Sequence, residues 1–205
     1  MIALKRLDLD PHSIDAVLVS HLHGDHFGGL PFLVLDQQFA RRVRVLHVAG
    51  PTGLSDRLHE AMEVLFPGSS TVERRFVVKV HELREQEASR VGPAQVSTVQ
   101  VVHPSGAPAL GLRVNCGGRI IAYSGDTEWS ESLVDLSRDA DLFICEAYTV
   151  ARSIKYHMSY AALQKRRAQL GCRRLVLTHV GPDLLAHSPE IEAEIATDGY
   201  SIDLI

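Results

Sequence analysis

Long apolar segments are missing from this 205-residue chain, and so is an excess of basic residues. No apolar run approaches the roughly 20 residues that a membrane-spanning helix needs, so we expect no membrane partner. The 21 Lys and Arg residues stand against 25 Asp and Glu residues, which gives a formal net charge of −4. Because nucleic acid is bound through clustered cations, this balance argues against a long nucleic acid as partner. It permits a small phosphate ester as substrate.

Cysteine is also scarce, with only Cys116, Cys145 and Cys172 in the chain. An odd number of widely spaced cysteines does not form the framework of a disulfide-rich secreted protein. The first residues lack the apolar segment of a signal peptide. We therefore expect reduced thiols and a cytoplasmic location. The length and the ordinary composition, 45% hydrophobic and 22% charged, predict a single domain over residues 1–205.

The most informative stretch is residues 20–26, SHLHGDH, which follows a short apolar run. Imidazole and carboxylate together are ligands of zinc, manganese or iron. A chain that leaves a strand and turns at the glycine can direct His21 and His23 toward one metal, and Asp25 and His26 toward a second. The eleven histidines of the chain make some clustering expected by chance, so a merely His-rich loop is the alternative. The order of four ligand types favours the metal site.

The pattern His-x-His-x-Asp-His after a strand resembles the motif of the metallo-β-lactamase superfamily. The resemblance implies an α/β fold, a four-layer αββα sandwich with metals in the cleft at one edge. It also implies three more ligands at strand ends: a histidine, a bridging aspartate and a last histidine. His103 in VHP, Asp126 in SGDT and His179 in LTHVG stand at those places. Each alone would more often be a structural residue, but together and in this order they complete the set.

The resemblance thus implies a site for two divalent ions that share a hydroxide, a nucleophile near neutral pH. Zinc is the expected metal, and manganese or iron are the alternatives. Asp25 has a second, catalytic role in this scheme, because its free oxygen can orient the hydroxide. The expected ligands are His21, His23 and His103 for metal 1, Asp25, His26 and His179 for metal 2, and Asp126 as the bridge.

One further histidine, His157 in KYHMS, reads from its spacing alone as a surface loop residue. The chain is similar to the branch that contains ribonuclease Z and the small cyclic phosphodiesterases, and that similarity implies a catalytic role. There the histidine contacts the scissile phosphate and protonates the leaving oxygen, which suits imidazole because it titrates near neutral pH. Glu146, in CEAY, is a candidate to orient His157, and pairing with a local cation is the alternative.

Two departures from that branch shape the predicted function. Ribonuclease Z carries a long arm that holds tRNA, and the segment 126–157 leaves no room for it, so we expect a small or cyclic phosphodiester as substrate. Superfamily members usually have strands before the motif strand, whereas only about 20 residues precede His21. The N-terminal strands are thus expected to be truncated. A free sheet edge invites pairing, so we expect a homodimer whose interface includes residues 1–15 or the edge beside them.

Two other functions stay open. An acyl or thioester hydrolase, such as a lactonase or a glyoxalase-like enzyme, uses the same metal set, because one hydroxide attacks phosphorus or carbonyl carbon. A metal-binding module without turnover is the third possibility. His157 favours the phosphodiester, and a glyoxalase-like enzyme would carry a helical extension where only about 25 residues follow His179.

Hydrophobic periodicity predicts alternating strands and helices along the chain. Strands are expected over 16–19, 43–48, 76–80, 96–102, 110–114, 119–123, 142–145, 175–177 and 200–204. Helices are expected over 27–40, 54–65, 129–136, 159–170 and 189–196.

Overall fold

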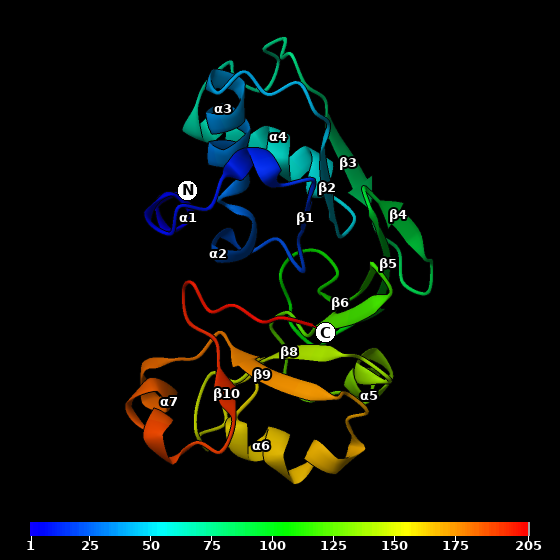
Figure 1. Cartoon of the computed structure of the whole chain (residues 1–205), viewed down its shortest axis with the longest axis vertical. Coiled ribbons are helices and arrows are strands. Elements are labelled where there is room, and N and C mark those ends of the chain that lie inside the picture. The colour runs from blue at the N-terminus through cyan, green and yellow to red at the C-terminus, as the bar shows by residue number, and fades with distance from the viewer. Residues whose placement is uncertain (205) are drawn as a thin grey trace.

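The computed structural model describes residues 1–204, which form two sheets with helices on their outer sides (Figure 1). The strands are β1 (Ala16–Leu18), β2 (Leu46–Gly50), β3 (Val78–Glu82), β4 (Ser89–Val91), β5 (Ala94–Gln100), β6 (Leu110–Cys116), β7 (Arg119–Tyr123), β8 (Leu142–Glu146), β9 (Arg174–Thr178) and β10 (Glu194–Ile195). The helices are α1 (Ile2–Arg6), α2 (Gly24–Phe27), α3 (Leu30–Phe39), α4 (Leu54–Leu65), α5 (Ser132–Ser137), α6 (Tyr160–Lys165) and α7 (Pro182–Ala186). Short 3-10 helices cover η1 (Pro11–Ser13), η2 (Arg167–Gln169) and η3 (Ser188–Glu190).

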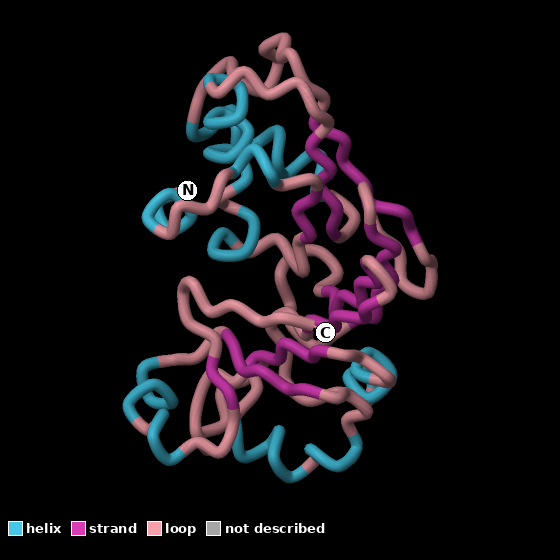
Figure 2. Tube along the Cα trace, in the orientation of Figure 1, coloured by secondary structure: helices cyan, strands magenta, loops and turns pink. Residues whose placement is uncertain are grey.

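The two sheets differ in strand direction and size. The first is parallel with the order β1-β2-β3, and the second has the order β10-β9-β8-β7-β6-β5-β4. The second sheet is antiparallel from β4 to β7 and parallel from β7 to β10. In Figure 2, α3 and α4 lie to the left of the strands of the first sheet, and α6 and α7 lie below the strands of the second sheet.

Three apolar clusters separate four layers. One lies between the first sheet and α3 and α4, and a second lies between the second sheet and α5, α6 and α7. The third cluster, which includes Ala49, Val96 and Leu112, lies between the two sheets. The predicted αββα layering is therefore confirmed. None of the helices within residues 1–204 combines the length and the apolar character that crossing a membrane requires.

The first sheet has β1 at one edge, next to the N-terminal residues. Residues 1–15 form α1 and η1, and they add no strand to that edge. The first sheet thus has an unpaired edge, formed by half-buried residues, at the strand that leads into the SHLHGDH motif.

Two elements predicted near the end of the chain are wrong. The helix expected over 189–196 is replaced by η3 and the short strand β10, and residues 200–204 contain no strand. The edge of β9 accepts β10 as a parallel partner, and Arg174 on β9 bonds Glu194 on β10 through contacts of 2.6 to 3.2 Å. This pairing outweighs the local helical pattern, because strand formation depends strongly on the neighbouring strand.

Candidate metal centre

The SHLHGDH motif leaves β1 in an extended conformation and turns into α2. His23 is the N-cap of α2 with extended backbone angles, and the chain bends again at Gly28. A Cβ atom at Gly28 would lie 2.4 Å from the carbonyl oxygen of Gly24, so only glycine fits there. The helix expected over 27–40 is shortened to α3, and Phe27 belongs to the separate turn α2, which also carries Asp25 and His26 of the motif.

A second close approach brings Asp126 to the same loop. Gly125 has a φ of +60°, and a Cβ atom on it would lie 2.9 Å from the Cβ atom of Ser20. The carbonyl oxygen of Ser20 accepts a hydrogen bond from the amide of Leu110 at 2.9 Å. The first contact holds the end of β1 against the end of β7, and the second holds it against β6, although β1 belongs to a different sheet from β6 and β7.

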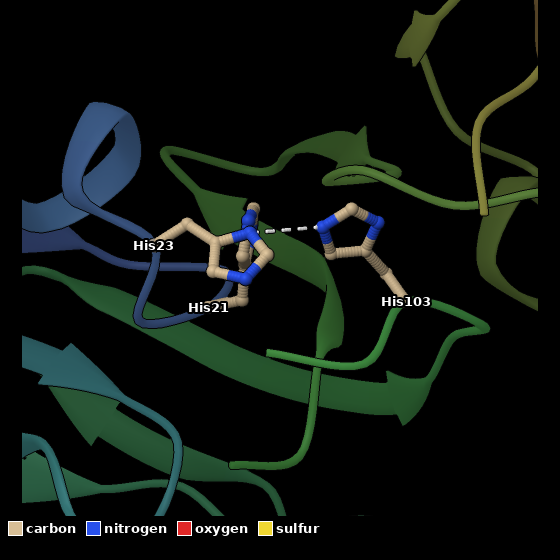
Figure 3. A group of neighbouring side chains, drawn as sticks. All are labelled: His21, His23 and His103. Carbon is tan, nitrogen blue, oxygen red and sulfur yellow. Dashed lines mark hydrogen bonds between the residues drawn. The ribbon is translucent and has the colours of Figure 1, made fainter. Parts of the chain in front are cut away.

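Three histidines from distant parts of the chain converge (Figure 3). The rings of His21, His23 and His103 lie 4.7 to 4.9 Å apart by their centroids and stand at 67 to 79° to one another. One nitrogen of each ring lies within 4.8 Å of the others. The Nδ1 atom of His103 lies 3.0 Å from the carbonyl oxygen of Tyr156, which leaves its Nε2 atom to face His23 at 3.1 Å. Such a carbonyl contact orients a metal-binding imidazole.

Asp126 lies at the centre of the histidines. Its Oδ1 atom is 3.3 Å from Nε2 of His26 and 3.4 Å from Nδ1 of His179. Its Oδ2 atom is 4.0 Å from Nε2 of both His21 and His103. One carboxylate thus faces both halves of the predicted ligand set.

Two buried atoms at this centre have no hydrogen-bond partner within the described residues: Oδ1 of Asp126 and Nε2 of His21. Buried polar atoms are nearly always paired, because leaving one unpaired is costly. A cation between them would satisfy both. The residues present therefore fit a metal ion on chemical grounds as well as by their convergence.

The second group of ligand atoms is more open to solvent. Asp25, His26 and His179 each offer an atom within 4.8 Å of the others, and the Asp25 side chain is 67% exposed. The structure thus brings all seven predicted ligands together, from the SHLHGDH motif and from the ends of β5, β7 and β9.

Glu146, at the end of β8, has a larger role in the geometry than sequence reasoning assigned. It is fully buried, and its Oε1 atom contacts Nδ1 of His157 and lies 3.2 Å from Nδ1 of His179. Its Oε2 atom accepts bonds from the amides of Thr127 (2.7 Å) and Met158 (3.2 Å). The partners of Glu146 are therefore two imidazoles and two amides, and no Lys or Arg among the described residues pairs with it.

The contact between Glu146 and His179 was missed at the level of sequence. The one available signal is that both residues end buried strands, since β8 and β9 pair in parallel with Glu146 opposite Thr178. That pairing cannot be read from either strand alone.

Burial and neighbouring imidazoles set the electrostatics of the centre. Burial, helped by the nearby His26, lowers the pKa of His21 to about 3, so His21 is neutral at pH 7, in the form that binds metal. Burial alone would raise the pKa of Asp126, but the imidazoles of His26, His179 and His21 outweigh it and hold that pKa below its usual value. The hydrogen bond to Glu146 raises the pKa of His179.

The metal-free protein should lose stability in mild acid because of His21. Its pKa is 6.5 in the ordinary, unfolded environment and about 3 in the folded protein. Between these values the unfolded chain binds the extra proton, so the free energy of unfolding falls as the pH decreases from 6.5 toward 3. This one group contributes a slope of up to about 1.4 kcal/mol per pH unit.

Urea unfolding of chelator-treated protein across that pH range measures the slope. His21→Asn, which removes the titrating imidazole, is expected to flatten the profile. Equal slopes for the wild type and the variant would contradict the assignment.

An open cavity of about 450 Å³ lies over the centre. It is lined by His23, Asp25, His103, Asp126, Tyr148, Ile154, His157 and His179. The cavity therefore exposes ligands from both groups together with the predicted acid His157.

Comparison with known proteins agrees with this geometry. The model of the family described as "Beta-lactamase superfamily domain" matches residues 3–180. The uncharacterised protein Rv1339 of Mycobacterium tuberculosis is 32% identical over 196 residues, which cover 93% of this chain and 70% of that protein. Ribonuclease Z of Bacillus velezensis is 25% identical over 236 residues, which cover 88% of this chain and 74% of that enzyme.

A solved structure supports the fold. Human tRNase Z, short form, superposes with a TM-score of 0.77 at 24% identity, covering 98% of this chain and 83% of that one.

Proposed function

The chain belongs to the beta-lactamase superfamily of metallo-hydrolases, and on that premise we propose that it is a dinuclear metal-dependent phosphodiesterase acting on a small or cyclic phosphodiester. The observation that carries the phosphodiester half of the proposal is His157, held by the buried Glu146 at the rim of the metal centre. We propose that residues 1–205 act as one domain, because the ligands come from both sheets.

The donor set suits two divalent ions. One would be held by His21, His23 and His103, and the other by Asp25, His26 and His179, with Asp126 between them. Zinc suits these nitrogen and oxygen ligands, and manganese or iron are alternatives. Ions at such a site lower the pKa of water and so supply a nucleophile near neutral pH.

Three further side chains would transfer a proton or orient a reacting group. Glu146 accepts from Nδ1 of His157, which leaves Nε2 as the nitrogen that can deliver a proton to the leaving oxygen. The two amides bonded to Oε2 hold the Glu146 carboxylate in place. Asp25, the most exposed of the seven ligands, would orient the attacking water with its free oxygen.

The relatives support the substrate class. Ribonuclease Z acts, by its name, on RNA, whose backbone links are phosphodiesters. Between Asp126 and His157 this chain has only α5, β8 and short connections, so we propose a small substrate in place of tRNA. An acyl or thioester hydrolase would use the metals but would have no need of the Glu146–His157 pair.

The test compares two generic substrates on metal-loaded protein. We expect turnover of bis(p-nitrophenyl) phosphate and little turnover of p-nitrophenyl acetate, with both signals lost after chelation. Preference for the acetate would replace the proposal by an esterase or lactonase. Bound metal without turnover of either substrate would identify a metal-binding module.

We also propose that the protein is a homodimer through residues 1–15 and the edge of β1. Ile2, Leu7 and Leu9 are 85%, 37% and 51% exposed, and Leu4 of the same segment lines a cavity with Val17 of β1. Exposed strand edges and apolar side chains both favour association. Light scattering at micromolar concentration should give twice the chain mass, and Ile2→Asp with Leu9→Asp should shift it to the monomer. A wild-type monomer would refute this interface.

A further inference from the structure

Tyr148 lines the same cavity as the candidate ligands but is not one of the seven predicted ligands. It lies two residues after Glu146, and its backbone is held on both sides. Its amide donates to the carbonyl oxygen of Met158 at 2.9 Å, and its own carbonyl oxygen accepts from the amide of Gly181 at 2.9 Å. The position of the tyrosine ring beside the centre is therefore set by the fold.

The ring is packed against three neighbours. Its centroid lies 5.2 Å from that of His157 and 5.6 Å from that of His179, with tilts of 35° and 33°. A Cβ atom at Gly181 would lie 3.3 Å from Cε2 and Cζ of the ring and 2.6 Å from the carbonyl oxygen of Tyr148. Because these contacts occupy the ring, stacking of a substrate base on it is disfavoured. The hydroxyl is the group left over. Tyr148 is only half-buried and lines the cavity, and within residues 1–204 its hydroxyl forms no hydrogen bond.

The charge of the cavity lining limits which kind of phosphate ester this hydroxyl can bind. None of the residues lining the cavity is Lys or Arg, so the chain itself adds no fixed positive charge there. A phosphodiester carries a single negative charge on two non-bridging oxygens, and a neutral O–H donor suits it. A phosphomonoester carries a second charge for which this lining offers no partner beyond the metals.

We infer that Tyr148 is a substrate-binding residue whose hydroxyl donates a hydrogen bond to a non-bridging oxygen of a singly charged phosphodiester. The inference rests on the proposed phosphodiesterase function and assigns the class of ester that the site prefers. A hydrogen bond to a charged acceptor contributes more than a neutral one, so its loss should weaken binding about tenfold.

The test is Tyr148→Phe, which keeps the ring and removes only the hydroxyl. We expect KM for bis(p-nitrophenyl) phosphate to rise about tenfold while kcat changes little. Binding of dimethyl phosphate, followed by phosphorus NMR on metal-loaded protein, should weaken by the same factor. Metal content and the pH profile of kcat should match the wild type. Tyr160→Phe, on α6 and outside the cavity lining, is the matched control and should leave all four measurements unchanged.

Two results would overturn the inference. Unchanged KM and unchanged binding of dimethyl phosphate would show that the hydroxyl does not reach the substrate. Loss of metal or a shifted pH profile would show that Tyr148 acts through His179 or His157 instead. If the wild type hydrolyses no phosphodiester, the proposed function fails, yet the binding of dimethyl phosphate by the wild type and Tyr148→Phe still decides the role of Tyr148.

Discussion

Replacing Asp126 with alanine is expected to empty both metal sites and to abolish hydrolysis. Asp126 is 3% exposed, and its two oxygens lie 3.3 to 4.0 Å from nitrogens of His21, His26, His103 and His179. The five imidazoles of the ligand set and the exposed Asp25 would then face two dications without the central carboxylate. Elemental analysis of protein purified without chelator should fall from about two equivalents to near none.

Variants of single ligands should each release the ion from only one of the two metal sites. His103→Ala should weaken only the ion held by His21 and His23, and His179→Ala only the ion held by Asp25 and His26. Asp198→Ala removes an exposed carboxylate that is not a predicted ligand and serves as control, because its ion pair with Arg6 is a weak surface contact of 3.5 Å. Two equivalents of metal retained in Asp126→Ala would remove the basis for the assignment.

The second large effect is expected for His157→Ala, which should lower turnover by about 10² to 10⁴ without releasing metal. His157 bonds Glu146 and lies outside both triads of predicted ligands. Its ligand nitrogen also lies within 4.8 Å of ligand atoms of Asp126, Glu146 and His179, so the metal content of the variant decides between an acid and a ligand. If His157 is the general acid, the pH–rate profile of the variant should also lack the limb that is due to the protonation of this acid. The deficit should be smaller for a substrate with a good leaving group, such as p-nitrophenolate, than for one with an alkoxide.

Controls separate this role from a structural one. His187→Ala removes a half-exposed histidine at the C-cap of α7 and should leave turnover unchanged. Glu146→Gln should resemble His157→Ala in rate, but it should also weaken the ion at His179, because Glu146 contacts both imidazoles. Loss of metal from His157→Ala itself would make His157 a ligand and would refute its role as the acid.

The types of ligand at this site could be predicted from the sequence because a side chain's ability to bind a metal depends on that side chain alone. His21, His23, Asp25 and His26 follow one strand within six positions, and no tertiary contact is needed to see that they offer metal donors. His103, Asp126 and His179 were identifiable only through their order and their places at strand ends, as the family pattern implies. The layered fold was predicted in the same way.

Tertiary structure alone decided which groups surround those ligands. Glu146 contacts both His157 and His179 because β8 pairs with β9. The carbonyl oxygen of Tyr156 orients the ring of His103, and the ring of Tyr148 packs against Gly181. The same holds for β10, which the local pattern presents as a helix. The ability to bind a metal belongs to a single side chain and can be read from the sequence. The partner of a buried carboxylate, or of an unpaired strand edge, depends on which distant segment packs beside it.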